Sequence, residues 1–322
     1  MDNKELAKYQ TAADICAKVM KTLLEMITSE TELRLVNLSN FGNTMIVDEC
    51  TKVYKREKDR GIAFPVCISL NHCAGHFIPE NTEQIIQKGD VVKIELGVTI
   101  GGCIAMLGET IVYGQIDKES EQALECLDKL AQNIEKSFRA NKTNDNARMK
   151  IESLCTNYNC FPMENTFSFQ QELGHLRTQD SKYMVLNHKK YYNDNNELYN
   201  EADICYQFEE GEVYTVNLVI IPSTIEHQFI EHHKPHVYRY NDCFYNLKLK
   251  SSRAFINTIN KNHAHNAFSV IPYTSEPKWR IGIKEASENC ILDDFPVLYT
   301  QSGDNVYFKK FTWIVGNKLR YK

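Results

Sequence analysis

The densest group of metal-binding side chains lies in residues 226–236, EHQFIEHHKPH. Imidazole and carboxylate groups are common zinc ligands in proteins. The segment holds six of them, namely Glu226, His227, Glu231, His232, His233 and His236. A chance affinity for zinc or nickel is one interpretation, but the spacing does not match ligands fixed on one helical face. Solvated histidines in a loop are the better prediction.

Thiol chemistry is the second candidate, because the chain contains 11 cysteines. They are scattered and include no C-x-x-C, so neither a disulfide framework nor a thiolate zinc site is indicated, and reduced thiols in the cytosol or nucleus are expected. Cys155 and Cys160 could form a redox pair, but nothing around them in the sequence activates a thiol, and we expect both to be buried. No glycine-rich phosphate loop, nucleophile elbow or catalytic triad signature is found.

Charge is distributed unevenly along the chain, whose 37 basic and 42 acidic residues give a formal charge of -5. Residues 1–233 carry 23 basic and 35 acidic residues, a net charge of -12, whereas residues 234–322 carry 14 and 7, a net charge of +7. Most of this excess lies in residues 234–284, where nine basic residues meet only two acidic ones. Such a segment, with aromatic residues nearby, fits a phosphate backbone. Charge blocks also often do no more than solvate a face.

Length and composition exclude several classes of protein. With 43% hydrophobic and 11% aromatic residues among 322, the chain can bury a sizeable core, which excludes a disordered or collagen-like protein. No run approaches the ~18 apolar residues of a membrane span, and the first residues lack the order of a signal peptide. The length fits two compact units, or one α/β unit with an insertion.

Hydrophobic periodicity predicts the elements that must position these residues. Helices are expected from Asp2 or Asn3 to Ile27, and over 44–59, 119–139, 143–157, 250–262 and 278–290. Strands are expected over 61–71, in a hairpin over 89–114 that turns at Gly101 and Gly102, in a second hairpin-like unit over 209–223, and over 295–299 and 305–315. The polar residues 188–202 predict an exposed loop. A mostly helical insertion between strands of one sheet explains this order better than two tandem domains.

Five segments resemble, in order and spacing, the type 2 methionine aminopeptidase fold. They are GIAFPVCISLNHCAGHFIP, GDVVKIELGVTIGGCIA, EEGEVYTVNLV, LKLKSSRAF and FKKFTWIV. LKLKSSRAF favours the non-peptidase branch, which comprises the proliferation-associated (ErbB-binding) proteins and related large-subunit export factors. The resemblance implies an α/β (α+β) pita-bread fold, in which helices cover a curved antiparallel sheet in two pseudo-symmetric halves. It also implies one domain over residues 1–322, with a mostly helical, basic insertion at residues 236–294.

Peptidases of this fold hold two divalent ions with two Asp, one His and two Glu, and the ions generate the attacking hydroxide. Flanking motifs locate these five positions in the present chain. They are occupied by Glu95, Met106, Phe169, Asn217 and Lys310, with His175 and Lys309 as alternatives to Phe169 and Lys310. A thioether is a poor ligand for such ions, and an ammonium group repels them. At most one ligand is retained, so we expect no catalytic residue, no bound metal and no cofactor.

Two structural hypotheses follow from these substitutions. His76, which matches the substrate-facing histidine of the family, is expected to be a hydrogen-bonded structural residue. Lys310 is predicted to occupy the vacated cation position and to pair with Glu95, which would join the two halves of the fold. A separation of the two charged groups well beyond about 4 Å would contradict this pairing.

The resemblance implies a catalytically inactive, monomeric factor that binds the large ribosomal subunit near the polypeptide exit tunnel, through rRNA and ribosomal proteins. The expected RNA contacts are Lys248, Lys250, Arg253, Lys261, Lys278, Arg280 and Lys284. The lysine-rich tail usual in proliferation-associated proteins does not follow the last predicted strand, which favours the cytoplasm over the nucleus as the location. Two alternatives stay open: a methionine aminopeptidase with a non-standard metal site, and a peptide- or histone-binding chaperone of the same fold.

Overall fold

A curved antiparallel sheet forms the centre of the computed structural model, which describes residues 1–164, 166–178, 180–187, 205–222, 230–241, 243 and 245–321. Within these residues the sheet has eight strands in the order β1-β2-β3-β11-β7-β5-β6, and β4 pairs with β7. The strands are β1 Arg60–Leu70, β2 Val91–Ile100, β3 Cys103–Val112, β4 Cys160–Pro162, β5 Phe167–Gln171, β6 Tyr183–Val185, β7 Val213–Pro222 and β11 Tyr307–Ile314.

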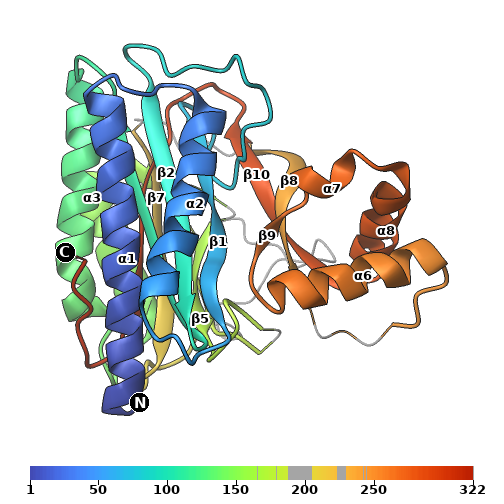
Figure 1. Ribbon diagram of the computed structural model, residues 1–322. Helices are drawn as coiled ribbons and strands as arrows, with labels where there is room; N and C mark the ends of the chain where they lie inside the picture. Colours follow the sequence, from blue (N-terminus) through green and yellow to red (C-terminus); the bar gives the residue numbers. More distant parts are fainter. Residues whose placement is uncertain are drawn as a thin grey trace.

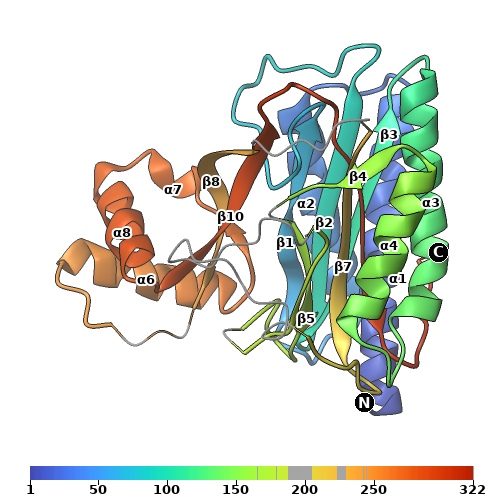
Figure 2. The same cartoon turned by 180° about the vertical axis from the view of Figure 1, so that it is seen from behind.

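Among the described residues, four helices cover one face of this sheet (Figures 1 and 2). They are α1 Asn3–Thr28, α2 Leu35–Lys52, α3 Lys118–Ser137 and α4 Asn144–Asn157. The first two pack on β1, β2 and β3, whereas α3 packs on β7 and β11 and α4 on β4. Each pair of helices buries its own apolar core, one around Leu23 and Ile94 and the other around Leu130 and Tyr214. The sheet is therefore built from two similar halves.

The first helix begins where the sequence predicts. The Asp2 side chain accepts the backbone N–H groups of Lys4 and Glu5 at 2.8 and 2.7 Å, and the Glu5 carboxylate accepts the N–H of Asp2 at 3.1 Å. This capping box satisfies donors that the first turn of a helix cannot pair internally. The predicted hairpin is also present, because Gly101 and Gly102 adopt positive φ angles of 58° and 82° between β2 and β3, as the tight turn requires.

The second helix differs from the prediction at both ends. It was expected over residues 44–59, but α2 spans Leu35–Lys52. Its start carries no side-chain cap, so the usual sequence signal is missing. The charged run after Lys52 leaves the helix instead of extending it, because Tyr54 adopts a φ of 41° and its carbonyl accepts the N–H of Glu57 at 2.8 Å. Residues 54–57 therefore form a turn.

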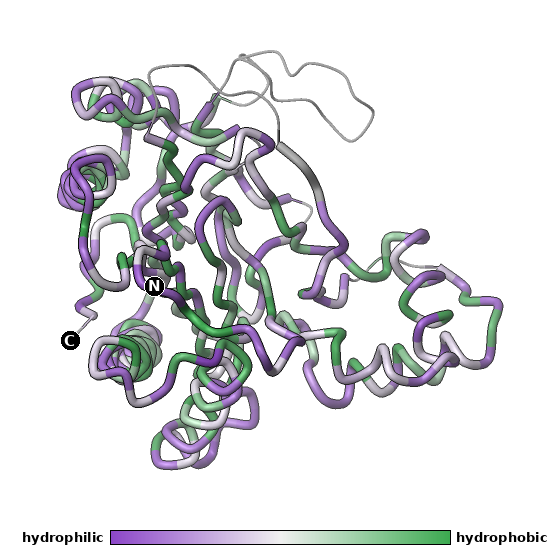
Figure 3. Tube along the Cα trace, turned by 90° about the horizontal axis from the view of Figure 1, so that it is seen from above, coloured by the Kyte–Doolittle hydropathy of each residue, from purple (hydrophilic) through white to green (hydrophobic). Residues whose placement is uncertain are grey.

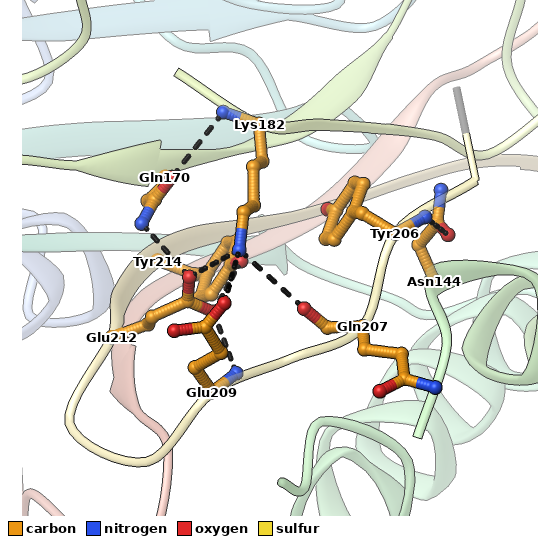
Figure 4. Close-up of polar contacts among 8 residues, drawn as sticks. All are labelled: Asn144, Gln170, Lys182, Tyr206, Gln207, Glu209, Glu212 and Tyr214. Carbon is orange, nitrogen blue, oxygen red and sulfur yellow. Dashed lines mark hydrogen bonds and ion pairs between the residues drawn. The ribbon is translucent and has the colours of Figure 1, made fainter. Parts of the chain in front are cut away.

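The predicted hairpin-like unit over residues 209–223 is one long strand, β7. It pairs with β11, β5 and β4, all of them distant in sequence. A polar cluster holds its start in place (Figure 4): the Glu212 carboxylate forms an ion pair with Lys182 and accepts hydrogen bonds from Gln170 at 3.1 Å and from the Tyr214 hydroxyl at 2.9 Å. These contacts fasten β7 to β5 and to the segment before β6. The loop predicted over residues 188–202 lies outside the described residues.

A second sheet and a group of helices lie on the opposite face of the main sheet from α1–α4 (Figures 1 and 3). The sheet has the order β10-β8-β9, with β8 Ile230–Tyr240, β9 Phe268–Ser269 and β10 Leu292–Thr300. The insertion helices, α6 Lys250–His263, α7 Ile271–Thr274 and α8 Pro277–Glu288, connect β8 to β10. α6 and α8 approach closely because Gly282 has no Cβ, which would lie 2.9 Å from the Cβ of Phe255.

The histidine-rich segment is predicted to be a loop, and this is wrong for residues 230–236, which belong to β8, where residues 230–233 pair with β10. Residues 226–229 lie outside the described residues. His236 is partly buried, and its Nδ1 lies 3.0 Å from the carbonyl oxygen of Ile78. Strand pairing overrode the polar composition that favoured a loop. Across the described part of the chain, no helix is long and apolar enough to cross a membrane.

A buried lysine that the sequence does not reveal lies on β2. Lys93 is fully buried, and its Nζ donates to the carbonyl oxygens of Asn71 and Val91 at 2.8 and 3.4 Å. Both carbonyls also accept a backbone N–H, from Val306 and Asn71 respectively. Burial lowers the pKa of Lys93 from 10.5 to about 7, because the charged amine is poorly solvated there.

We predict that Lys93→Met stabilises the protein near neutral pH. The folded protein binds fewer protons than the unfolded chain between pH 7 and 10.5, so the wild type gains stability as pH rises through that range. The advantage of the variant should therefore be constant below pH 7 and shrink by about 1.4 kcal/mol per pH unit above it. Urea unfolding at several pH values measures this. Lys21→Met, which removes an exposed lysine, is the control, and an advantage of Lys93→Met that does not change with pH would contradict the prediction.

Candidate functional site

The residues at the five predicted ligand positions lie on the inner face of the main sheet, the face turned away from α1–α4. Gly108 of β3 pairs with Glu95 on one side and with Lys310 on the other, and Lys310 also pairs with Asn217 of β7. Directly paired residues in antiparallel strands point to the same face. The four residues thus form one row across β2, β3, β11 and β7.

The two remaining positions lie beside this row. Met106 of β3 pairs with Gly97 of β2, two residues along each strand from the pair of Glu95 and Gly108. Phe169 of β5 pairs with Thr215 of β7. The alternatives lie elsewhere: His175 follows β5 in a turn and its ring is 4.3 Å from that of His265. Lys309 points to the helix side, where it pairs with Glu109 and Asp128. Phe169 and Lys310 therefore lie on the strands that carry the row, whereas His175 lies in a turn and Lys309 faces the helices.

The ion pair predicted between Lys310 and Glu95 is present. The Lys310 ammonium contacts Glu95 Oε2, and only 6% and 1% of the two side chains are exposed. To reach Glu95, the lysine must cross β3 above Gly108. A Cβ at that glycine would lie 2.8 Å from the Cβ of Lys310 and 2.7 Å from the ring of Phe308. A glycine at position 108 is thus a condition for the pair.

Glu95 is held by a second group, the loop that follows β1. The backbone N–H of His76 donates to Glu95 Oε1, and His76 Nε2 lies 3.8 Å from Oε2. Burial by itself raises the pKa of Glu95, but the Lys310 ammonium, together with His76, lowers that pKa below its usual value. The rings of Phe64 and Phe308 lie 5.8 and 5.6 Å from Lys310 Nζ, within the range of cation–π attraction.

His76 is hydrogen-bonded, as expected. Its Nδ1 lies 3.0 Å from the carbonyl oxygen of Pro296 in β10. Burial lowers the pKa of His76 to about 4, so the ring is neutral at pH 7 and donates its Nδ1–H to this carbonyl. The same loop bonds β10 through Ala74 N–H to Leu298 and Thr300 N–H to His72. The ion pair is therefore connected, through one loop, to the sheet that carries the insertion helices.

The donor set on the inner face does not fit a pair of divalent ions. Its one carboxylate is already neutralised by an ammonium group, and the Met106 sulfur lies directly above Gly97, 2.5 Å from where a Cβ would be. Asn217 Oδ1 is buried and has no hydrogen-bond partner among the described residues, but a single amide oxygen does not make a site for a hard cation. No group of three or more potential ligands for a metal exists among the described residues.

The seven predicted RNA contacts all lie on the insertion helices or next to them, and all are exposed. Four have partners: Lys278 pairs with Glu276 at 2.6 Å, Lys284 lies 3.8 Å from Glu288, and Arg253 and Arg280 donate to backbone carbonyls. The side chains of Lys248, Lys250 and Lys261 form no ion pair with any residue in the described ranges.

One basic residue of the same segment is not on this surface. Arg239 is 3% exposed and shares the carboxylate of Asp293 with Arg177, at 2.9 and 2.8 Å. Arg177 also donates to the carbonyl of Asp294 and stacks over Phe295 at 4.5 Å. This buried cluster joins β8 and β10 to the turn after β5. A charge count along the sequence cannot separate such a structural arginine from a surface one.

Comparison with known proteins agrees with this geometry. A family model, Metallopeptidase family M24, matches residues 7–242. Proliferation-associated protein A of Dictyostelium discoideum is 30% identical over 291 residues, which cover 87% of this chain and 72% of that protein. The chain belongs to metallopeptidase family M24. ERBB-3 BINDING PROTEIN 1 of Arabidopsis thaliana is 28% identical over 330 residues, covering 97% of this chain and 80% of that protein.

Among solved structures, a thermophilic Arx1 superimposes with a TM-score of 0.81 at 17% sequence identity, and the match covers 97% of this chain and 88% of that one. At this identity the likeness shows the fold alone. The resemblance to the proliferation-associated group and the pita-bread fold it implies are both confirmed. Family M24 takes its name from metallopeptidases, yet of the five ligand positions predicted from the sequence only position 95 carries a carboxylate.

We predict that Lys310→Met destabilises the protein by about 3–5 kcal/mol, because it leaves Glu95 as a buried, unpaired carboxylate. Glu95→Gln combined with Lys310→Met should lower the free energy of unfolding by less, since no uncompensated charge remains.

The loss in free energy of unfolding of the single variant should also shrink as pH falls towards 4. In the wild type the pKa of Glu95 lies below its usual value, whereas an unpaired buried carboxylate has a raised pKa and takes up a proton as the pH falls. Denaturant unfolding of both variants and the wild type, at pH 4 and pH 7, measures these differences; equal costs for the single and double variants would contradict the role of the pair.

Proposed function

We propose that this protein is a catalytically inactive member of family M24 that binds the large ribosomal subunit near the polypeptide exit tunnel, through contacts with rRNA and ribosomal proteins. The observation that carries the proposal is the concentration of exposed cations on the insertion helices. All seven candidate residues stand at the surface of one small unit. A phosphate backbone is the partner that a surface of this kind fits best.

The proposed inactivity rests on the donor set of the inner face. Hydrolysis by two metal ions needs several carboxylate oxygens to hold the ions and an open position for water. Here Lys310 supplies a positive charge at the place where ions would be held, and Met106 and Phe169 are apolar and buried. The residues that remain support a fixed structure and supply no nucleophile.

The inner face also supports the proposed binding role. The loop that carries His76 bonds both Glu95 and β10, and β10 is the strand that follows the insertion helices in the chain. An ion pair has no exchangeable ion to lose, so this connection does not depend on a metal supply. In this proposal the inner face of the main sheet holds the RNA-binding helices in position.

We predict that the protein co-sediments with large ribosomal subunits at low salt and is released steeply as salt rises, because each bound phosphate releases counterions. Lys250→Ala combined with Lys261→Ala should lower the slope of log affinity against log salt by about 2. Lys278→Ala should have a smaller effect, because Glu276 already neutralises that charge at 2.6 Å.

The matched control for this pair is Lys118→Ala combined with Lys129→Ala. Both lysines are exposed on α3 and have no ion pair with a residue that the structure describes, and α3 covers the opposite side of the main sheet. Absence of co-sedimentation at low salt would contradict the proposal. If the control variant lost as much binding as the Lys250 and Lys261 variant, the binding would be non-specific charge attraction.

A second prediction concerns catalysis. The purified protein should not cleave methionine from peptides and should carry less than one equivalent of metal after incubation with manganese, cobalt or zinc, because the inner face offers one carboxylate and an ammonium group. A peptidase assay and elemental analysis measure this. Turnover that a chelator abolishes would instead establish the alternative, an aminopeptidase with a non-standard site.

A further inference from the structure

The turn between α2 and β1 bears a hollow that none of the functions considered above uses. The hollow has a volume of about 430 Å³ and is lined by Tyr54, Lys55, Arg56 and Glu57. The turn is well defined, because Tyr54 adopts a φ of 41° and its carbonyl accepts the N–H of Glu57 at 2.8 Å. Lys55 and Arg56 occupy its two central positions, so both side chains project from the surface.

The positive charge of this turn is not neutralised. Lys55, Arg56 and Lys58 are exposed, and their side chains make no ion pair or hydrogen bond with any described residue. The two acidic residues of the same run are engaged elsewhere. Glu57 pairs with Lys8 at 2.8 Å, and Asp59 accepts hydrogen bonds from Thr99 and Asn266, both at 3.3 Å. Two exposed cations, Lys55 and Arg56, therefore line the hollow, and Lys58 follows them in the chain.

The neighbouring basic groups, by contrast, are occupied. Lys52 pairs with Glu49 at 2.6 Å, and Arg60 donates to the carbonyl of Val53 at 2.8 Å, where it closes the end of α2. Lys52 and Arg60 therefore stabilise the fold, whereas the cations between them face solvent. These exposed cations are available to bind a ligand.

The turn adjoins the insertion helices in space although it is far from them in sequence. Asn266, which bonds Asp59, follows α6 by three residues, and Ala267 N–H donates to the Ala63 carbonyl of β1 at 2.9 Å. Lys261, one of the unpaired lysines, lies in the last turn of α6. The turn is therefore joined, through Asp59 and Asn266, to the segment that follows α6.

We propose that residues 54–58 form a second RNA contact, in which Lys55, Arg56 and Lys58 bind phosphates and Tyr54 stacks on an unpaired base. This inference rests on the proposed function and names the part of the nucleic acid that the body of the protein binds. Cations beside an exposed aromatic ring are the arrangement with which proteins bind single-stranded nucleic acid. Tyr54 is 36% exposed beside this group. An acidic peptide would also be attracted to the cations, but it has no base that could stack on the Tyr54 ring.

The test measures binding of a labelled polyuridine oligonucleotide to the full chain over a series of salt concentrations. Lys55→Ala combined with Arg56→Ala should lower the slope of log affinity against log salt by about 2. Tyr54→Ala should weaken binding about fivefold or more with no change of slope, because stacking is not a charge effect, and Tyr54→Phe should bind as the wild type does. The control, Lys118→Ala combined with Lys129→Ala, removes two unpaired lysines from α3 and should change little.

Three results would overturn the inference. The first is a Lys55 and Arg56 double variant that binds like the control. The second is a Tyr54→Ala variant with undiminished affinity, which would exclude the stacked base. The third is a polyglutamate peptide that binds as tightly as polyuridine with the same dependence on the turn, which would identify an acidic protein as the partner.

The same variants separate this inference from the proposed function. Large subunits that are bound by the wild type, released by the Lys250 and Lys261 double variant and unaffected by the Lys55 and Arg56 double variant would retain the proposed function and reject the second contact. Polyuridine binding that depends on the turn, without any binding to large subunits, would retain the RNA contact at the turn and reject the proposed function. Because all substituted residues are exposed, unchanged melting temperatures should accompany every variant.

Discussion

The rest of the structure depends on the buried pair of Lys310 and Glu95. A carboxylate in this position is costly unless an opposite charge compensates it. In the peptidases of this fold metal ions compensate such carboxylates, and here an ammonium from the last strand does so. The consequence extends beyond two residues. Glu95 accepts the backbone N–H of His76, and the His76 ring bonds the Pro296 carbonyl of β10. Because β10 follows the insertion helices in the chain, the ion pair is connected to the surface that those helices carry.

The proposed metal-free inner face and the proposed basic binding surface are therefore connected physically. An ion that must be bound and retained makes the geometry of a site depend on the supply of that ion, whereas a lysine is always present. A binding protein benefits from this permanence, because its surface must be preformed to limit the ordering cost of association. The buried Arg177, Asp293 and Arg239 cluster serves the same end by joining β8 and β10 to the turn after β5.

Much of the fold could be predicted from the chain alone, and the errors have identifiable causes. The capping box of α1, the glycine turn of the β2–β3 hairpin and the helical insertion are local signals, and all three are present. The start of α2 has no cap, so its boundary was placed nine residues late. Residues 230–236 are polar enough to predict a loop, yet they belong to β8, which pairs with β10, a partner more than fifty residues away.

The sequence by itself determined that the family is M24 and that positive charge gathers beyond residue 234, because residue type and order carry this information. Only the tertiary structure decided which charges matter. It paired Lys310 with Glu95 across Gly108, buried Lys93 and Arg239, and joined Asp59, which follows the exposed cations of residues 55–58, to Asn266 after α6. Burial and pairing are properties of neighbours in space, and a linear count of charge cannot contain them.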